Sequence, residues 1–142
     1  MILTLGEGPS NLIAASSSKQ KMVARSSYES ELIGVYDKYP LAKWALSAVK
    51  EWGYEGGPIV LYQDNQSVIH TMEHGPAPHS NSSHLRKRLF WIQQELEEDQ
   101  AVTRYKESSL MLADPLTKAN IDMGTLNRLY SVVMRIDEDT VL

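Results

Sequence analysis

The sequence predicts one α/β domain, in which helices cover both faces of a mixed sheet. Two short apolar segments near the N-terminus indicate a hairpin. After the hairpin, helical and strand-like patterns alternate along the chain. The chain has 142 residues, the usual size of a single domain, and shows no internal repeat. These observations together favour a sheet with helices packed against it.

Composition excludes several other classes of protein. Apolar residues make up 42% of the chain and charged residues 23%, as in an ordinary globular protein. The absence of cysteine excludes disulfides, thiol catalysis and zinc–thiolate sites, and it fits an intracellular protein. No apolar run approaches the roughly 20 residues that span a bilayer, so we expect no membrane segment. The net charge of −4 argues mildly against nucleic-acid binding, although metal-binding carboxylates would supply part of it.

The first half of the chain is expected to form the hairpin and a long helical region. Residues 1–5 and 12–15 are the two strands, separated by a Gly-rich and Pro-containing turn. Ser27 is the expected N-cap of the long helix. Pro40 should break or kink this helix, and a second helical stretch should then end at Gly53.

The second half alternates between strands and helices. Residues 59–62 form an unbroken apolar run, typical of a strand that is buried on both faces. A short helix over 65–72 and a loop over 75–81 follow, and 101–106 alternate as a strand does. A last helix is expected over 125–134. A further helix is predicted between the loop and the strand over 101–106, because four apolar residues recur there at helical spacing: Leu85, Leu89, Ile92 and Leu96.

Three acidic residues are candidates for a functional site. Asp64 follows an apolar strand, and ligands bind at the carboxyl ends of strands in open α/β sheets, but it could equally cap the next helix. Glu31 is expected in the first turn of the long helix, where the helix dipole favours a glutamate whatever its function. Glu29 competes with it and lies about 200° around the helix, so the two cannot face one site. Asp114 precedes Pro115, which is typical of a helix start.

Four motifs occur together in a recognisable order. They are Ser17-Ser18-Lys19-Gln20 with Val23-Ala24 and Ser26-Ser27-x-Glu29-x-Glu31; Asp64-Asn65-Gln66-Ser67; His84; and Ala113-Asp114-x-x-Thr117-Lys118. This series resembles the ribonuclease H domain of the Pol polyprotein of copia-type LTR retrotransposons. The resemblance covers residues 1 to about 120 as one ribonuclease H-like domain, and a C-terminal helix and acidic tail occupy residues 121–142.

The resemblance implies a ribonuclease H fold that hydrolyses the RNA of RNA–DNA hybrids. It implies that three residues are both catalytic and ligands of two Mg²⁺ ions, with Mn²⁺ as an alternative: Glu31, Asp64 and Asp114. Contact with the hybrid is expected from Asn65, Gln66, His84 and Arg86. It further implies a larger polyprotein with reverse transcriptase and integrase, located in the cytoplasm, the nucleus or a virus-like particle.

The chain departs from the family pattern in two places. The family has a strand before the hairpin that carries a further aspartate ligand, and this strand has no counterpart here. We therefore expect a sheet without its first strand, and a chain that is inactive by itself. His84 precedes Leu85-Arg86 where the family usually has Ile-Asp, and Arg86-Lys87-Arg88 fits a solvated helix face as well as a phosphate-binding one. The alternative function is a non-catalytic nucleic-acid- or protein-binding module of the same fold.

Overall fold

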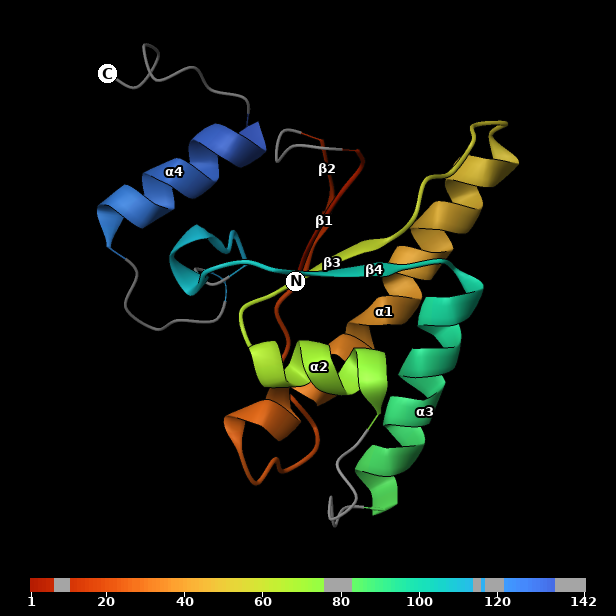
Figure 1. Ribbon diagram of the computed structural model, residues 1–142. Helices are drawn as coiled ribbons and strands as arrows, with labels where there is room; N and C mark the ends of the chain where they lie inside the picture. The colour runs from red at the N-terminus through yellow and green to blue at the C-terminus, as the bar shows by residue number, and fades with distance from the viewer. Residues whose placement is uncertain (7–10, 76–82, 114–115, 117–121, 135–142) are drawn as a thin grey trace. The chain divides into compact units, whose positions relative to one another are not determined.

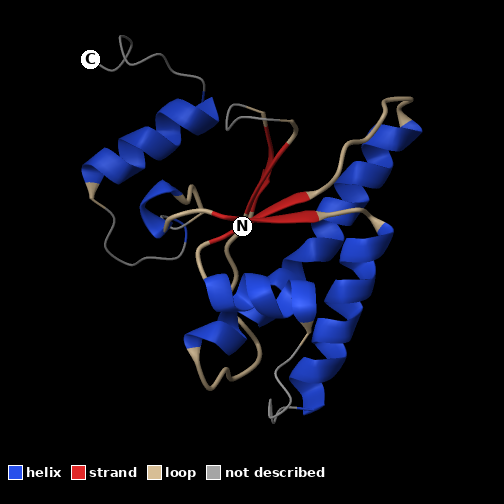
Figure 2. Ribbon diagram, viewed as in Figure 1, coloured by secondary structure: helices blue, strands red, loops and turns tan. Residues whose placement is uncertain are grey.

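The structure, a computed structural model, describes residues 1–6, 11–75, 83–113, 116 and 122–134 (Figure 1). Helices and short strands alternate along the chain, which confirms the α/β class (Figure 2). The chain forms two compact units, one of Met1–Lys19 with Ser108–Leu142 and the other of Gln20–Glu107. The described strands form two separate two-stranded sheets, so the larger mixed sheet with helices on both faces stays a prediction. None of the described helices is long and apolar enough to cross a bilayer.

The first unit contains the expected hairpin. β1 (Ile2–Thr4) pairs antiparallel with β2 (Leu12–Ala15), with an irregularity in the register near the end of β1. A short 3₁₀ helix, Ser108–Leu110, follows later in the chain. α4 (Met123–Met134) begins two residues earlier than predicted. Asp122 explains this start, because its side chain accepts a hydrogen bond from a backbone N–H in the first turn of α4.

The second unit begins with a long helix, α1 (Ser27–Glu51). Its N-cap is Ser26 rather than Ser27, because the Ser26 Oγ accepts a hydrogen bond from the backbone N–H of Glu29 at 3.2 Å. The carboxylate of Glu29 in turn accepts a hydrogen bond from the backbone N–H just before the cap. Glu29 is therefore engaged in the helix start. The earlier cap also places Glu31 in the second turn of α1, not in the first as predicted.

The predicted break at Pro40 is wrong, because α1 runs through this residue, and the alternative of a kink stays a prediction. Proline inside a helix removes one hydrogen bond and costs about 3 kcal/mol. Pro40 is exposed, whereas Tyr39 and Ala42 beside it are buried in the unit. Burial of these neighbours offsets the cost of the proline and keeps the helix in one piece. α1 ends just before Gly53, as predicted, and the φ of 84° at Gly53 is one that glycine adopts without strain.

A parallel strand pair follows α1. β3 (Val60–Gln63) pairs with β4 (Val102–Tyr105), and Tyr62 lies opposite Arg104. Residue Leu61 packs against the core, whereas Tyr62 on the opposite face of the pair is 49% exposed. The expectation that this strand is buried on both faces is therefore wrong, because the core of the second unit packs against one face of the pair.

The core of the second unit is built by α1, α2 (Gln66–His74) and α3 (Ser83–Glu98), and α1 and α3 lie side by side in Figure 1. Its buried side chains are Leu32, Ile33, Tyr39, Val68, Met72, Leu85, Leu89, Ile92 and Leu96. All four residues of the apolar stripe predicted for α3 belong to this cluster. The stripe is therefore confirmed, and it positions α3 against the other two helices.

Tyr39 links α1 to the C-terminal end of α3. Its hydroxyl donates a hydrogen bond to Asp99 Oδ2 at 2.9 Å, and burial together with the Asp99 carboxylate raises the pKa of Tyr39. Replacing Tyr39 by phenylalanine should lower the free energy of unfolding by about 1–2 kcal/mol, because Asp99 loses its donor. Urea unfolding followed by circular dichroism measures this. A loss equal to that of an exposed Tyr54→Phe control would contradict a stabilising role for the bond.

Candidate functional site

The candidate site begins where β3 ends. The side chain of Gln63 is buried, and its Oε1 accepts hydrogen bonds from the backbone N–H of Asp64 at 2.8 Å and of Asn65 at 3.4 Å. A single amide oxygen therefore satisfies two backbone donors at the point where the chain leaves the sheet. This arrangement fixes the backbone that carries Asp64. The sequence carries one signal for this role, a polar residue at the end of an apolar run.

The next residue, Asn65, is the N-cap of α2. Its Oδ1 accepts hydrogen bonds from the backbone N–H groups of Ser67 at 3.0 Å and Val68 at 3.4 Å. The interpretation of Asp64 as the cap of this helix is therefore wrong, since its neighbour takes that role. α2 also extends two residues beyond its predicted end, to His74. Helix capping thus gives no account of the aspartate at this position.

Glu31 of α1 lies beside this corner. The Asn65 side chain forms a hydrogen bond with the Glu31 carboxylate, and Asp64 is close enough to interact with it electrostatically. Burial raises the pKa of Glu31 above its usual value, the Asn65 hydrogen bond lowers it, and the charge of Asp64 raises it. The Oε2 of Glu31 is buried and makes no hydrogen bond in the described part of the chain. Two segments far apart in sequence thus place two carboxylates within electrostatic range of each other.

The structure does not test the third acid. Asp114 lies outside the described residues, so its convergence with Glu31 and Asp64 stays a prediction. Within the described ranges, no group of three or more histidine, aspartate or glutamate side chains is arranged to hold a metal ion. The described part of the site therefore consists of the carboxylate pair of Glu31 and Asp64. Asn65 connects this pair to α2, because it caps the helix and forms a hydrogen bond with Glu31.

The residues expected to contact nucleic acid fall into different environments. Gln66 is exposed at the start of α2, and Arg86 is exposed on α3. His84 belongs to α3, but its side chain lies outside the described part. Arg88 is half-buried, with its guanidinium 4.9 Å from the centre of the Tyr36 ring. The solvated-face interpretation of the basic run is therefore wrong for Arg88, because the helical period turns this residue toward α1.

Comparison with known proteins gives this site a context. Over 118 residues, or 82% of its length, the chain is 31% identical to a retrovirus-related Pol polyprotein from transposon RE2 of Arabidopsis thaliana. The chain is related to a retrotransposon Pol polyprotein. It spans about 8% of the length of that relative, so the similarity concerns one region of a long polyprotein. No protein-family model matches the chain, and no solved structure matches it significantly.

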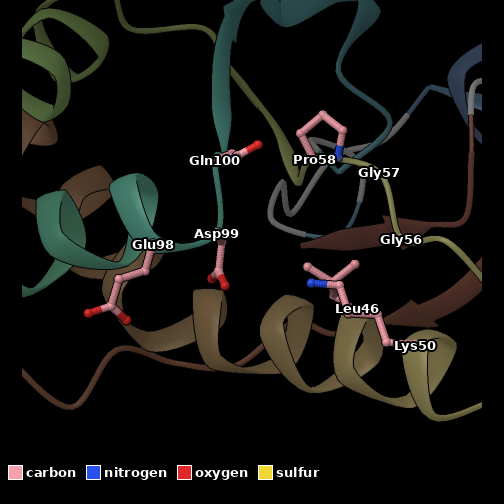
Figure 3. A pocket seen from close by; sticks show the side chains of 8 residues that line it. All are labelled: Leu46, Lys50, Gly56, Gly57, Pro58, Glu98, Asp99 and Gln100. Atoms are coloured by element: carbon pink, nitrogen blue, oxygen red, sulfur yellow. The ribbon is translucent and has the colours of Figure 1, made fainter.

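The second unit also has a hollow of about 260 Å³ away from the carboxylate pair. Figure 3 shows it between the C-terminal part of α1, the segment before β3 and the turn that follows α3. Gly56 forms part of its wall and lies so close to α1 that a Cβ there would be 2.5 Å from the Leu46 Cδ1. None of the candidate site residues lines this hollow, and we assign it no part in the site.

The raised pKa of Glu31 predicts a pH-dependent gain in stability for Glu31→Gln. Ionised Glu31 is less favourable in the folded chain than in the unfolded chain, so its contribution to stability is lost as pH rises through the folded pKa. The glutamine keeps an acceptor for Asn65 and should raise the melting temperature by about 1–3 °C at pH 7. At about pH 3.5, where the glutamate is protonated in both states, the gain should vanish.

Thermal unfolding by circular dichroism at the two pH values measures this difference. Glu51→Gln, which removes an exposed carboxylate from the end of the same helix, is the matched control. A Glu31→Gln protein that melts at or below the temperature of the unmodified chain at pH 7 would contradict the unfavourable burial of this carboxylate.

Proposed function

We propose that the chain is the ribonuclease H-like region of a retroelement Pol polyprotein, a domain that hydrolyses the RNA strand of RNA–DNA hybrids when a strand with the further aspartate precedes residue 1. The observation that carries this proposal is the pairing of Glu31 and Asp64 at the end of a strand, each within a motif that resembles those of copia-type ribonuclease H domains. The relationship to a Pol polyprotein supports the same origin. The partners would then be the reverse transcriptase and integrase regions of that polyprotein.

The donors at this site suit Mg²⁺. Hard cations such as Mg²⁺ prefer carboxylate oxygens and retain several water ligands. The buried Oε2 of Glu31 makes no hydrogen bond in the described part of the chain, and a bound cation would give it a partner. A cation would also offset the repulsion between Glu31 and Asp64 that contributes to the raised pKa of Glu31. We propose that Glu31 and Asp64 hold the ions, with Asp114 as a further ligand and Mn²⁺ as an alternative metal.

Two divalent cations would supply an activated water and stabilise the charge that develops on the leaving oxygen. The task of the protein is then to hold the carboxylates in position. Gln63 fixes the backbone at Asp64, and Asn65 both caps α2 and forms a hydrogen bond with Glu31. Gln66 at the start of α2 would face a backbone phosphate, which a helix N-terminus favours. The RNA strand would be recognised through its 2′-hydroxyl groups and the shape of the hybrid.

Metal binding is tested on the 142-residue protein, and cleavage is tested on a longer protein in which a strand with the further aspartate precedes residue 1. Mn²⁺ is paramagnetic, so at low concentrations it should broaden the backbone NMR signals around Glu31 and Asp64 before those of other acidic segments. Incubation of a hybrid with a labelled RNA strand should give shorter RNA products with the longer protein in Mg²⁺ or Mn²⁺ and none in EDTA, whereas the 142-residue chain should leave the RNA intact. If Mn²⁺ leaves the signals of Glu31 and Asp64 unchanged, the proposed metal site is wrong.

Binding of the hybrid by the longer protein without cleavage would favour the alternative, a non-catalytic nucleic-acid-binding module. The exposed basic side chains of Arg86 and Lys87 on α3 support this alternative. Because phosphate contacts release counterions, such binding should weaken steeply as salt rises. An Arg86→Gln/Lys87→Gln double variant should lower the affinity for the hybrid and reduce this salt dependence, and fluorescence anisotropy of a labelled hybrid measures both.

A further inference from the structure

α2 carries two histidines that lie side by side on its surface. His70 and His74 are four residues apart and both are exposed. Their rings are stacked, with centroids 4.5 Å apart and 24° between the ring planes. Residues at this spacing lie one above the other on a helix. The two imidazole rings therefore leave α2 in nearly the same direction and remain accessible to solvent.

A hydrogen bond orients the second ring. The Nδ1 of His74 lies 3.1 Å from the backbone carbonyl oxygen of His70. A carbonyl oxygen can only accept, so Nδ1 is the nitrogen that carries the proton and donates. In the neutral ring, the lone pair is then on Nε2, which is the nitrogen farther from the backbone. Histidines that bind metals commonly donate their other N–H to a carbonyl or carboxylate in this way, so His74 is oriented as a ligand.

We propose that His70 and His74 together bind one late first-row divalent cation, of the Zn²⁺ class. Imidazole nitrogen suits Zn²⁺, Cu²⁺ and Ni²⁺. At a Zn–N distance of 2.0–2.1 Å, two nitrogens at tetrahedral positions lie about 3.3 Å apart. To point both lone pairs at one ion, the rings must leave their stacked arrangement, and the side chains can do so by rotation because both are exposed. Water would fill the other positions, since the described residues contain no third histidine, aspartate or glutamate in a metal-binding arrangement.

The position of the pair on α2 also favours a cation. His74 lies in the last turn of α2, where unpaired carbonyl groups give the helix end a partial negative charge. Glu73 is turned toward a different partner, because its carboxylate accepts a hydrogen bond from the Thr103 hydroxyl on β4. A cation that bridges His70 and His74 would join two successive turns of a nine-residue helix and thereby stabilise it.

This site is independent of the carboxylate pair in its chemistry. Mg²⁺ prefers oxygen ligands and should not compete for two imidazole nitrogens. The proposal therefore does not rest on the proposed nuclease function, and either one can fail without the other.

Titration of the 142-residue protein with ZnCl₂, in excess Mg²⁺, tests the pair by isothermal calorimetry and by the ring-proton NMR signals of the histidines. We expect one Zn²⁺ per chain and shifts of the His70 and His74 ring signals. Even outer-shell partners of a metal contribute 10- to 100-fold to affinity, so His70→Ala or His74→Ala should weaken binding by at least about tenfold. Far-UV circular dichroism shows whether each variant stays folded; exposed positions on a helix should tolerate alanine.

The other two histidines of the chain provide the matched control. A His79→Ala/His84→Ala double variant should bind Zn²⁺ with unchanged affinity. Binding that survives in His70→Ala/His74→Ala, or no measurable binding by the unmodified protein at millimolar Zn²⁺, would overturn the proposal. If one single variant binds as tightly as the unmodified chain, the bidentate site is also excluded.

Discussion

In the longer protein with the upstream Asp-bearing strand, replacing Asp64 by asparagine should lower the rate of RNA cleavage by at least about 100-fold. The substitution keeps the size of the side chain but removes the negative charge that would bind the cations. Charge stabilisation by metal ions contributes several kcal/mol, and about 3 kcal/mol corresponds to a factor of about 10² in rate. The hydrogen bonds of Gln63 and Asn65 at this corner involve backbone N–H groups, so the variant should keep its local structure.

The control for this experiment is Asp37→Asn, which removes an exposed carboxylate from α1. It should leave the rate unchanged, which separates a local effect from a change in the net charge of the chain. Initial rates are measured on a labelled RNA strand at saturating Mg²⁺. Loss of the charge at Asp64 should also bring the pKa of Glu31 closer to its usual value, because the repulsion between the two carboxylates ends. A folded Asp64→Asn protein that cleaves at the original rate would refute the assigned role.

Those parts of the fold that depend on local patterns could be predicted from the sequence. The stripe from Leu85 to Leu96 fixes both the existence of α3 and the face that it buries, because helical periodicity and burial have the same cause. The hairpin of β1 and β2 followed from two apolar segments around a turn. The N-cap of α1 was predicted one residue too late. Ser26 and Ser27 are equally good caps by residue type, and the choice between them depends on the hydrogen bond from the backbone N–H of Glu29.

Two errors show where packing overrides local rules. Pro40 would end an isolated helix, but the buried residues before and after it hold α1 together. The apolar run that contains Tyr62 has the composition of a strand buried on both faces. The composition of a strand does not determine how many faces of it are packed against other elements, and Tyr62 is exposed. Both outcomes depend on contacts between segments far apart in the chain.

The candidate site could be predicted only in part. The sequence placed Asp64 at a strand end, but the role of Asn65 as the cap became clear only from its hydrogen bonds. Local patterns left Glu29 as a competitor of Glu31, and only the resemblance favoured Glu31; the structure engages Glu29 in the capping interactions and brings Glu31 within electrostatic range of Asp64. Which acid meets Asp64 depends on how α1 packs in the second unit, and no local pattern encodes this.

Truncation of Ile92 to alanine should have the largest effect on stability, with a loss of about 2–5 kcal/mol in the free energy of unfolding. Ile92 lies in the middle of α3, is fully buried at 0% exposure and belongs to the cluster shared with α1 and α2. Alanine is a better helix former than isoleucine, so helix propensity does not contribute to the loss. The loss comes from apolar surface returned to water and from the cavity left between the helices.

Phe90→Ala is the matched control, because it removes a larger apolar side chain from the same helix at a position that is 60% exposed. It should cost no more than about 0.5 kcal/mol if burial rather than side-chain size decides the effect. Urea unfolding of both variants measures the difference, with the slope of the transition as a check on two-state behaviour. An equal loss from both substitutions would show that α3 also buries its opposite face, and would contradict the single core-facing stripe from which this helix was predicted.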